Sequence, residues 1–376
     1  MLDGAIGRQI ERDAILEELH QVSTSRDRVP TIFHFHGPAS IGKTTLIRNA
    51  PQWVTQQHFP GIVQIDLHDP WSFDPVLKLM DVRNQVRAKP FGYTTDGFDY
   101  AFLLYDLAYR GGSLSGPHLK DSKFSPGKIV HDSVQDALKS GTTELIKDIQ
   151  KSGVWGILTA GVTGVQLTSS IALAAQAALI SGLAISSVQL ITVILNAARQ
   201  IAHKRRLFRD NEALAVLFSK EALPTADAFL DALPRILAKD ILVSSKVMMH
   251  PSLCITLDPA EELAADSDKY AGRVLSRRLF PLFTSLQNIL VVSSSRTSPD
   301  AWKRRVLPEP ESRSVKFHAH LLGKLRAGQV LLDLVELGVP SEAPEYRYLE
   351  NLAPNDMLDP ASVFLILSEF AAGRPA

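Results

Sequence analysis

The chain has 376 residues, which is long for one ordinary domain, so we expect two or three structural units. Its 40 Lys and Arg residues balance 40 Asp and Glu residues, and this even charge gives no specific signal for nucleic acid as a partner. The single cysteine, Cys254, excludes a disulfide within the chain and a cysteine-rich metal site, which suits a reducing compartment. The N-terminal segment is charged and amphipathic, unlike a secretory signal, so we expect a protein that is not secreted.

The first predicted element is an amphipathic helix within residues 5 to 20, which follows a Gly7-Arg8 step. Apolar side chains recur at near-helical spacing in this stretch, namely Ile6, Ile10, Ile15, Leu16 and Leu19. Such a helix is expected to bury one apolar face against a core.

A phosphate-binding loop is predicted at residues 31 to 45, TIFHFHGPASIGKTT, where a β-rich run leads through Gly37-x-x-x-x-Gly42-Lys43-Thr44 into a helix. The glycines let the backbone wrap around phosphates at a helix N-terminus. Lys43 then supplies a cation for the β and γ phosphates, and the Thr44 hydroxyl a ligand for Mg²⁺. We therefore expect the nucleotide to contact Gly37, Pro38, Ala39, Ser40, Ile41, Gly42, Lys43, Thr44 and Thr45.

Beyond this loop, residues 61 to 66 predict a second strand, which ends in Asp66. Residues 72 to 110 are expected to be helical, with a break at Tyr93 to Gly97. A flexible loop is predicted from Gly111 to about Lys128, because glycine, serine and proline cluster at its start.

The segment 152–198 contains no charged residue and no histidine over 47 residues. One interpretation is two membrane crossings, since one crossing takes about 20 apolar residues and basic residues flank both ends. The alternative is a buried, Ala- and Gly-rich helical hairpin, because Gln166, Gln176, Gln189 and Asn196 lower the hydrophobicity. The sequence leaves both open.

After two predicted amphipathic helices, 213 to 218 and 226 to 238, an apolar strand at 252 to 258 ends in Asp258. This is the Walker B form, in which Asp258 would hold Mg²⁺ through water. A further buried strand follows at 287 to 295 and ends in Ser294, Ser295 and Arg296. These two strands, the first ending in Asp and the second in a polar tip, resemble the Walker B and sensor strands of STAND ATPases. The resemblance implies that Asp66 lies on the second strand of the core and Asp258 on the third, with an additional strand between the two Walker strands.

The remaining elements are a short strand at 314 to 318, a helix at 321 to 337 and a helix at 362 to 370. The chain then ends with the step Gly373-Arg374-Pro375, followed by Ala376.

Three short motifs resemble those of STAND ATPases and related AAA+ proteins, the AP-ATPase or NB-ARC-like group. They are Ile6-Gly7-Arg8-x-x-Glu11, Ser294-Ser295-Arg296 where that family commonly has Thr-Thr-Arg, and the final Gly-x-Pro step. The resemblance implies that Arg8 lies against the nucleotide and that Pro375 packs near the base. It also implies that Ser294 or Ser295 touches the γ-phosphate or its attacking water, and that Arg296 senses it. The apolar insertion is in turn similar to that of KAP-family NTPases.

One position departs from the resemblance, because Pro259 follows Asp258 where the family usually has an acid. The nearest acids, Glu261 and Glu262, come about one helical turn later. The expected catalytic set is Lys43, Asp258, Glu261, Ser295 and Arg296, with Thr44 and Asp258 on the metal. Nucleotide binding is better supported than fast hydrolysis.

The predicted fold class is α/β, a three-layer P-loop NTPase core with a parallel sheet, an apolar helical insertion and a C-terminal helical portion. Its expected divisions are 1–110 and 211–312 for the core, 111–210 for the insertion and 313–376 for the helical lid. ATP with Mg²⁺ is the expected cofactor, because neither an Asn-Lys-x-Asp nor an Asp-x-x-Gly motif of GTPases is present.

Three functions remain open: an ATPase switch, a membrane-inserted NTPase, and a nucleotide-dependent scaffold that does not hydrolyse ATP. Each implies a protein partner or self-association. The expected location is the cytoplasm, or a membrane with the NTPase core on its reducing side.

Overall fold

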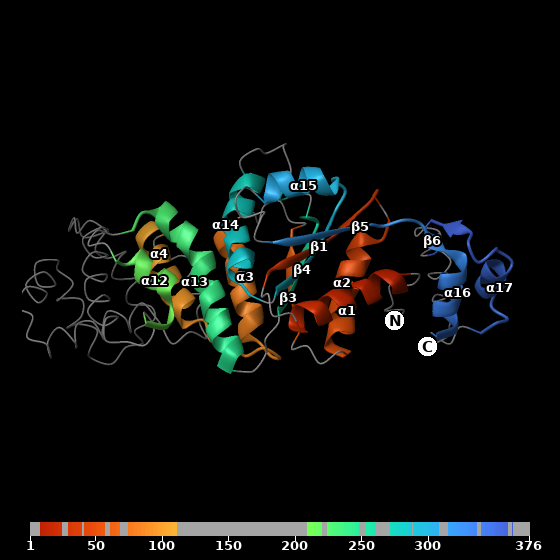
Figure 1. Cartoon of the computed structure of the whole chain (residues 1–376), viewed down its shortest axis with the longest axis horizontal. Coiled ribbons are helices and arrows are strands. Elements are labelled where there is room, and N and C mark those ends of the chain that lie inside the picture. Colours follow the sequence, from red (N-terminus) through yellow and green to blue (C-terminus); the bar gives the residue numbers. More distant parts are fainter. Residues whose placement is uncertain are drawn as a thin grey trace, which may run out of the picture. The chain divides into compact units, whose positions relative to one another are not determined.

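The computed structural model describes residues 8–24, 29–39, 41–56, 61–67, 74–110, 209–219, 224–247, 253–260, 263, 271–287, 289–307, 315–336, 340–359 and 363. The chain forms two compact units, one of residues 1–92 with 245–376 and one of residues 93–244 (Figure 1). The apolar segment 152–198 lies outside the described residues, so its two interpretations both stay predictions. None of the described helices is long and apolar enough to cross a membrane.

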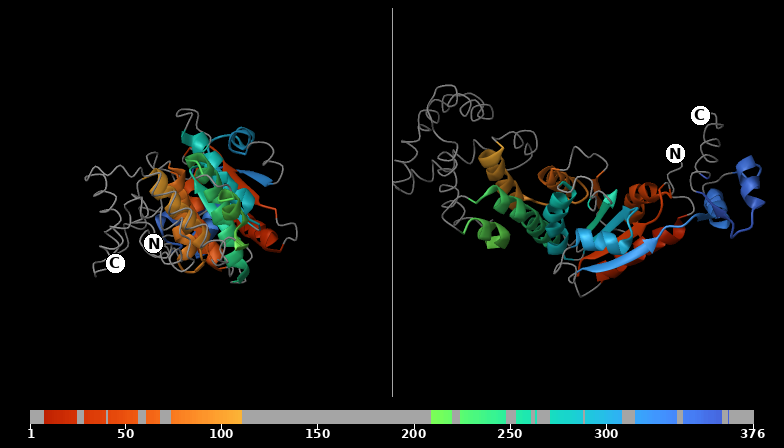
Figure 2. Two further views of the ribbon diagram at one scale, coloured as in Figure 1. Left: turned by 90° about the vertical axis from the view of Figure 1, so that its left-hand side faces the viewer. Right: turned by 90° about the horizontal axis from the view of Figure 1, so that it is seen from above.

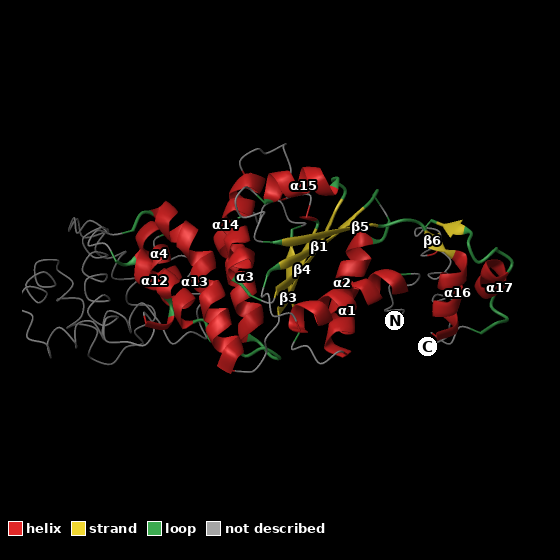
Figure 3. Cartoon of the chain, in the orientation of Figure 1, coloured by secondary structure: helices red, strands yellow, loops and turns green. Residues whose placement is uncertain are grey.

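The first unit contains a parallel sheet of five strands in the order β2-β3-β4-β1-β5 (Figure 3). The strands are β1 (Thr31–His36), β2 (Ile62–Asp66), β3 (Leu253–Asp258), β4 (Ile289–Ser295) and β5 (Lys316–Leu321). Every residue of β3 and β4 is buried, as expected for central parallel strands. β4 lies between β1 and β3, which confirms the predicted additional strand between the strand before the glycine-rich loop and the strand that ends in Asp258.

Helices α1 (Gln9–Thr24) and α2 (Lys43–Gln56) cover one face of this sheet (Figures 1 and 2). Apolar side chains of both helices form one buried cluster with Phe33 and Phe35 of β1 and with Cys254, Leu290 and Val292. α1 contributes Ile15, Leu19 and Val22, whereas Ile10 is exposed. The predicted N-terminal amphipathic helix is therefore confirmed, with its apolar face on the core.

The opposite face of the sheet carries α14 (Ala271–Ser285) and α15 (Pro299–Val306). Trp302 of α15 is fully buried and stacks on His34 of β1, with 4.5 Å between ring centroids. Phe317 of β5 and Phe280 of α14 complete this aromatic group. Helix α3 (Pro75–Arg87) packs beside β2 and α14. The parallel sheet is thus flanked by helices on both faces.

A small C-terminal portion follows β5 and has a hydrophobic cluster of its own. It consists of β6 (Leu325–Arg326), α16 (Ala327–Glu336), α17 (Pro344–Glu350) and β7 (Met357–Leu358), with β6 and β7 antiparallel. The predicted helix at 321 to 337 is wrong at its start, because pairing with β1 keeps residues up to Leu321 in β5. The strand predicted at 314 to 318 accordingly runs from Lys316 to Leu321. The helix predicted at 362 to 370 lies outside the described residues except for Val363.

The described helices of the second unit are α4 (Asp96–Tyr109), α12 (Glu212–Leu217) and α13 (Ala226–Val247), except that the last three residues of α13 belong to the first unit. They confirm the helices predicted at 213 to 218 and 226 to 238, the second of which extends to Val247. The break predicted at Tyr93 to Gly97 is confirmed in part, because α3 ends at Arg87 and α4 already begins at Asp96. Asp240 of α13 accepts hydrogen bonds from the Phe98 backbone N–H and from Asn211 Nδ2, both at 2.8 Å. Burial, offset in part by these bonds and reinforced by Asp99 and Asp96, raises the pKa of Asp240 to about 7.

Candidate functional site

The carboxyl ends of β1, β3 and β4 lie at one edge of the sheet because these strands are parallel and in register. Phe35 of β1 pairs with Ser294 of β4, and Leu257 of β3 pairs with Ser293. The glycine-rich loop after β1, the Asp258 carboxylate and the serine tip of β4 are therefore brought to the same edge. The sequence predicted this grouping from three separate motifs.

The loop between β1 and α2 uses its two glycines differently. Gly42 has φ +86°, a left-handed conformation that favours glycine, and its carbonyl accepts the Leu46 N–H of the first helical turn at 3.0 Å. A Cβ at Gly37 would stand 2.9 Å from the Leu322 carbonyl oxygen, directly after β5. Gly37 is thus also needed for the close approach of the loop to the segment that leaves the sheet.

Lys43, the first residue of α2, is buried and folds its side chain back onto the loop. Its Nζ donates to the Gly37 carbonyl at 2.9 Å and to the Pro38 carbonyl at 2.5 Å. These two carbonyls hold the ammonium group at the loop that the motif assigns to phosphate. A phosphate oxygen would replace one or both as a stronger, charged partner.

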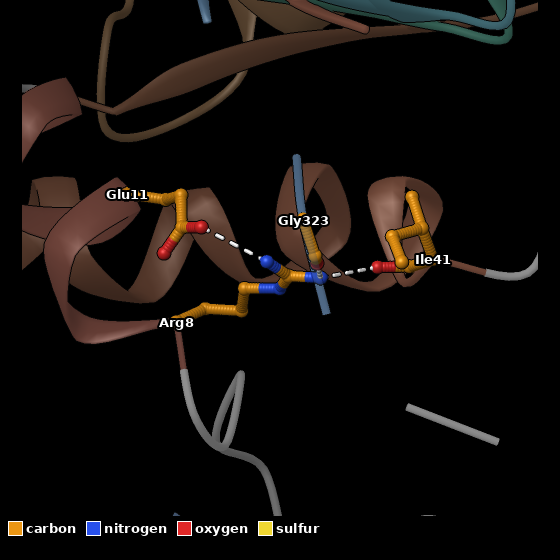
Figure 4. Close-up of polar contacts among 4 residues, drawn as sticks. All are labelled: Arg8, Glu11, Ile41 and Gly323. Carbon is orange, nitrogen blue, oxygen red and sulfur yellow. Dashed lines mark hydrogen bonds and ion pairs between the residues drawn. The ribbon is translucent and has the colours of Figure 1, made fainter. Parts of the chain in front are cut away.

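Arg8 ties the same loop to two other parts of the unit (Figure 4). Its Nη2 donates to the carbonyls of Ile41, at 2.6 Å, and Gly323, at 2.8 Å, while Nη1 pairs with Glu11 Oε1 at 2.9 Å. Both charged side chains are buried. Arg8 therefore lies against the glycine-rich loop through Ile41, and its contact with a nucleotide stays a prediction.

Asp258 ends β3 as a buried carboxylate with one oxygen engaged and one without a partner. Oδ1 accepts a hydrogen bond from the Ser294 hydroxyl, whereas Oδ2 has no hydrogen-bond partner among the described residues. Thr256, two residues earlier on the same face of β3, likewise has a buried Oγ1 without a partner there. A buried, unsatisfied carboxylate oxygen is costly by itself and suits a bound cation or its water. Asp258 thus fits the predicted magnesium ligand.

Ser295, predicted as a catalytic residue, lies on the other side of the β4 tip. It is fully buried, and its Oγ lies 3.0 Å from His34 Nε2, while Ser293 Oγ lies 2.8 Å from His34 Nδ1. Of the two candidate serines, Ser294 is the one that contacts Asp258. Burial, with the neighbouring His36 as a smaller cause, lowers the pKa of His34 to about 3.

Sequence reasoning did not single out His34 or Trp302. One signal was present, because a histidine at the centre of an apolar strand needs polar partners from neighbouring strands. The three consecutive serines at the end of β4 are such partners, two of which face His34.

The other predicted site residues are placed as follows. Thr44 is half-buried in the first turn of α2, and Thr45, Pro38, Ala39 and Arg296 are exposed. Ser40, Glu261 and Pro375 lie outside the described residues, so their predicted roles stay predictions. Asp66 is exposed beside Asp258 in the register of β2 and β3. Within the described ranges, no three His, Cys, Asp or Glu side chains gather as a metal cluster.

Comparison with known proteins does not add a family to this description. The sequence matches no family model, and it has no significant match among curated proteins or solved structures. The parallel sheet and its strand order are consistent with a Rossmann-like or P-loop fold. Functional interpretation therefore depends on the geometry at the sheet edge.

Proposed function

We propose that this chain is an ATP-binding P-loop protein that works as a nucleotide-controlled switch, with Mg²⁺ as its metal ion. The observation that carries the proposal is the meeting of two elements at one sheet edge. These are the Gly37 to Thr44 loop at the N-terminus of α2, and the buried Asp258 carboxylate, one oxygen of which has no hydrogen-bond partner in the part of the chain that the structure describes.

Each residue of the edge then has a defined task. The loop backbone and the α2 N-terminus bind the phosphates, and Lys43 exchanges its carbonyl partners for phosphate oxygens. Thr44 and Asp258 would hold Mg²⁺, which neutralises charge on the β and γ phosphates when it is bound. Ser294 orients Asp258 by donating a hydrogen bond from its hydroxyl group to one carboxylate oxygen.

The switch is motivated by the Arg8 contacts. One guanidinium nitrogen bonds both the phosphate loop, at Ile41, and the segment between β5 and the C-terminal portion, at Gly323. A change of the loop on binding phosphate would therefore reach the start of the C-terminal portion through one side chain.

Calorimetry with ATP and Mg²⁺ tests the proposal with a matched pair of variants. Lys43→Met should weaken ATP binding by about 100-fold, because the phosphate-facing charge is lost. Arg48→Met removes an exposed cation from the same helix and should leave the affinity within about twofold. Equal affinities for wild type and Lys43→Met would show that the loop is not the site.

A non-hydrolysing scaffold is the second candidate, favoured by the residues after Asp258. Pro259 occupies the position of the usual acid, and the following Ala260 carbonyl is held by Trp302 Nε1–H at 2.8 Å. Release of phosphate in single-turnover assays decides between the two candidates. Stoichiometric ATP binding with no phosphate release would favour the scaffold, whereas turnover that Asp258→Asn abolishes would favour the ATPase.

A further inference from the structure

The hydrogen bonds around His34 define one arrangement of protons. A buried imidazole with a pKa near 3 is neutral, so it offers one N–H donor and one acceptor nitrogen. Ser295 Oγ accepts the Thr297 N–H at 3.2 Å and lies at the same distance from the Thr297 carbonyl, to which its own proton goes. Ser295 can then only accept from His34, so Nε2 carries the proton and Nδ1 accepts from the Ser293 hydroxyl.

The His34 ring holds the end of β4 through two residues that lie two positions apart, Ser293 and Ser295. Ser293 and Ser295 point to one face of the sheet and bond the same ring, so the residue between them must point to the other face. That residue is Ser294, whose hydroxyl donates to Asp258 Oδ1. The orientation of the Asp258 carboxylate is therefore tied to a ring on the strand that leads into the phosphate loop.

A second tie reaches Asp258 from the other side. Trp302 stacks on His34 at 4.5 Å between centroids and 26° between planes, and its indole N–H donates to the carbonyl of Ala260, two residues after Asp258. The ring of His34 thus touches both restraints on the carboxylate, the serine tip and the tryptophan.

We propose that His34 is a positioning residue for the magnesium ligand Asp258: it holds Ser293 and Ser295, which aims Ser294 at Oδ1 and leaves Oδ2 for the ion. The inference rests on the proposed function. His34 itself touches neither nucleotide nor metal in this scheme. Its effect passes through Ser294, as for the outer partners that orient metal ligands.

The test compares ATP affinity with Mg²⁺ and with EDTA, since their ratio reports metal coupling without requiring hydrolysis. His34→Phe alone would leave two buried serine hydroxyls without their ring partner, so the informative variant is His34→Phe/Ser293→Ala/Ser295→Ala. It replaces all three polar side chains by apolar groups of similar shape, and the half-buried Thr297 backbone that Ser295 Oγ also bonds is left to water, so the cost in stability is small. Ser294→Ala removes the contact with Asp258 directly, and Phe317→Leu changes the aromatic group without touching a hydrogen bond.

The triple variant and Ser294→Ala should each reduce the Mg²⁺ coupling about tenfold, and adding Ser294→Ala to the triple variant should change it no further. Phe317→Leu should keep wild-type coupling. Amide hydrogen exchange of residues 293 to 295 in the nucleotide-free protein should be faster in the triple variant. A folded triple variant with wild-type coupling and wild-type exchange would overturn the positioning role.

Failure of the proposed function gives a different result. Wild-type protein that binds no ATP in calorimetry would remove the nucleotide site, whatever the exchange rates of β4. Wild-type protein that binds ATP equally with Mg²⁺ and with EDTA would overturn the assignment of Asp258, and the positioning role with it.

Discussion

On the loop side of the site, two cations are held by groups of the chain itself, whereas on the β3–β4 side a buried carboxylate oxygen has no hydrogen-bond partner among the residues that the structure describes. Lys43 and Arg8 bond four backbone carbonyls, and Arg8 also pairs with Glu11. Asp258 Oδ2 and Thr256 Oγ1 lack hydrogen bonds among the described residues. Phosphate binding would therefore require Lys43 to change partners, while a metal ion would meet a carboxylate oxygen that is already available.

The largest expected effect comes from breaking the buried ion pair of Arg8 and Glu11 on the loop side. Arg8→Ala should lower the free energy of unfolding by about 3–5 kcal/mol, because it leaves the buried Glu11 carboxylate without its cation. Urea unfolding measures this loss, and Arg8→Ala/Glu11→Ala should recover part of it. Arg12→Ala breaks an exposed pair with Asp13 and should cost less than about 1 kcal/mol. Similar losses at Arg8 and Arg12 would contradict the buried role.

The neutral network on the β4 side predicts a pH dependence. Because the pKa of His34 falls from its usual 6.5 to about 3 on folding, the unfolded chain binds a proton that the folded chain does not in this range. Protonation of His34 therefore does not lower the free energy of unfolding above pH 6.5. As the pH falls from 6.5 toward 3 the free energy of unfolding decreases, by about 3 kcal/mol near pH ~4.

Urea unfolding of wild type and of the His34→Phe/Ser293→Ala/Ser295→Ala variant between pH ~8 and ~4 measures this contribution. Because the triple variant lacks the imidazole, wild type should lose about 3 kcal/mol more stability than the variant between pH ~8 and ~4, and should become the less stable of the two at the acid end. His20→Gln, at an exposed histidine of α1, should follow the wild-type profile. Parallel profiles for wild type and the triple variant would show that His34 titrates normally.

A third prediction distinguishes the two neighbouring carboxylates of β3 and β2. Asp258→Asn should reduce the strengthening of ATP binding by Mg²⁺ about 100-fold, because the unpartnered oxygen loses its charge. Asp66→Asn changes an exposed residue at the same register and should leave it within about twofold. Calorimetry with and without Mg²⁺ reports both values, and the reverse ranking would move the metal ligand to β2.

The smallest effect concerns the close approach between the loop and the segment after β5. Gly37→Ala should cost about 1–3 kcal/mol in urea unfolding, because its Cβ meets the Leu322 carbonyl at 2.9 Å. Gly323→Ala adds a Cβ with nothing within 4 Å and should be nearly neutral. If Gly37→Ala were also neutral, the loop could shift away from Leu322 at no cost, and the close approach of Gly37 to that carbonyl would not be needed for stability.

Much of this arrangement could be predicted from short patterns. The strand, glycine loop and helix at 31 to 45, the strand ending in Asp258 and the strand ending in serines were each readable, since parallel strands place their carboxyl ends together. Element ends were less predictable. Residues 321 to 326 have a helix-like apolar spacing, but pairing with β1 and β7 puts Leu321, Leu325 and Arg326 in strands, and the residues between them are not helical.

The sequence by itself determined the strand, glycine-rich loop and helix at 31 to 45 and the strands that end in Asp258 and in serines, because each depends on local residue types and on their order along the chain. Only the tertiary structure decided which polar groups meet. The Arg8 contacts with Ile41 and Gly323, and the choice of Ser294 rather than Ser295 as the partner of Asp258, join residues more than thirty positions apart. Such contacts follow from strand register and from which face each side chain takes, and a linear pattern contains neither.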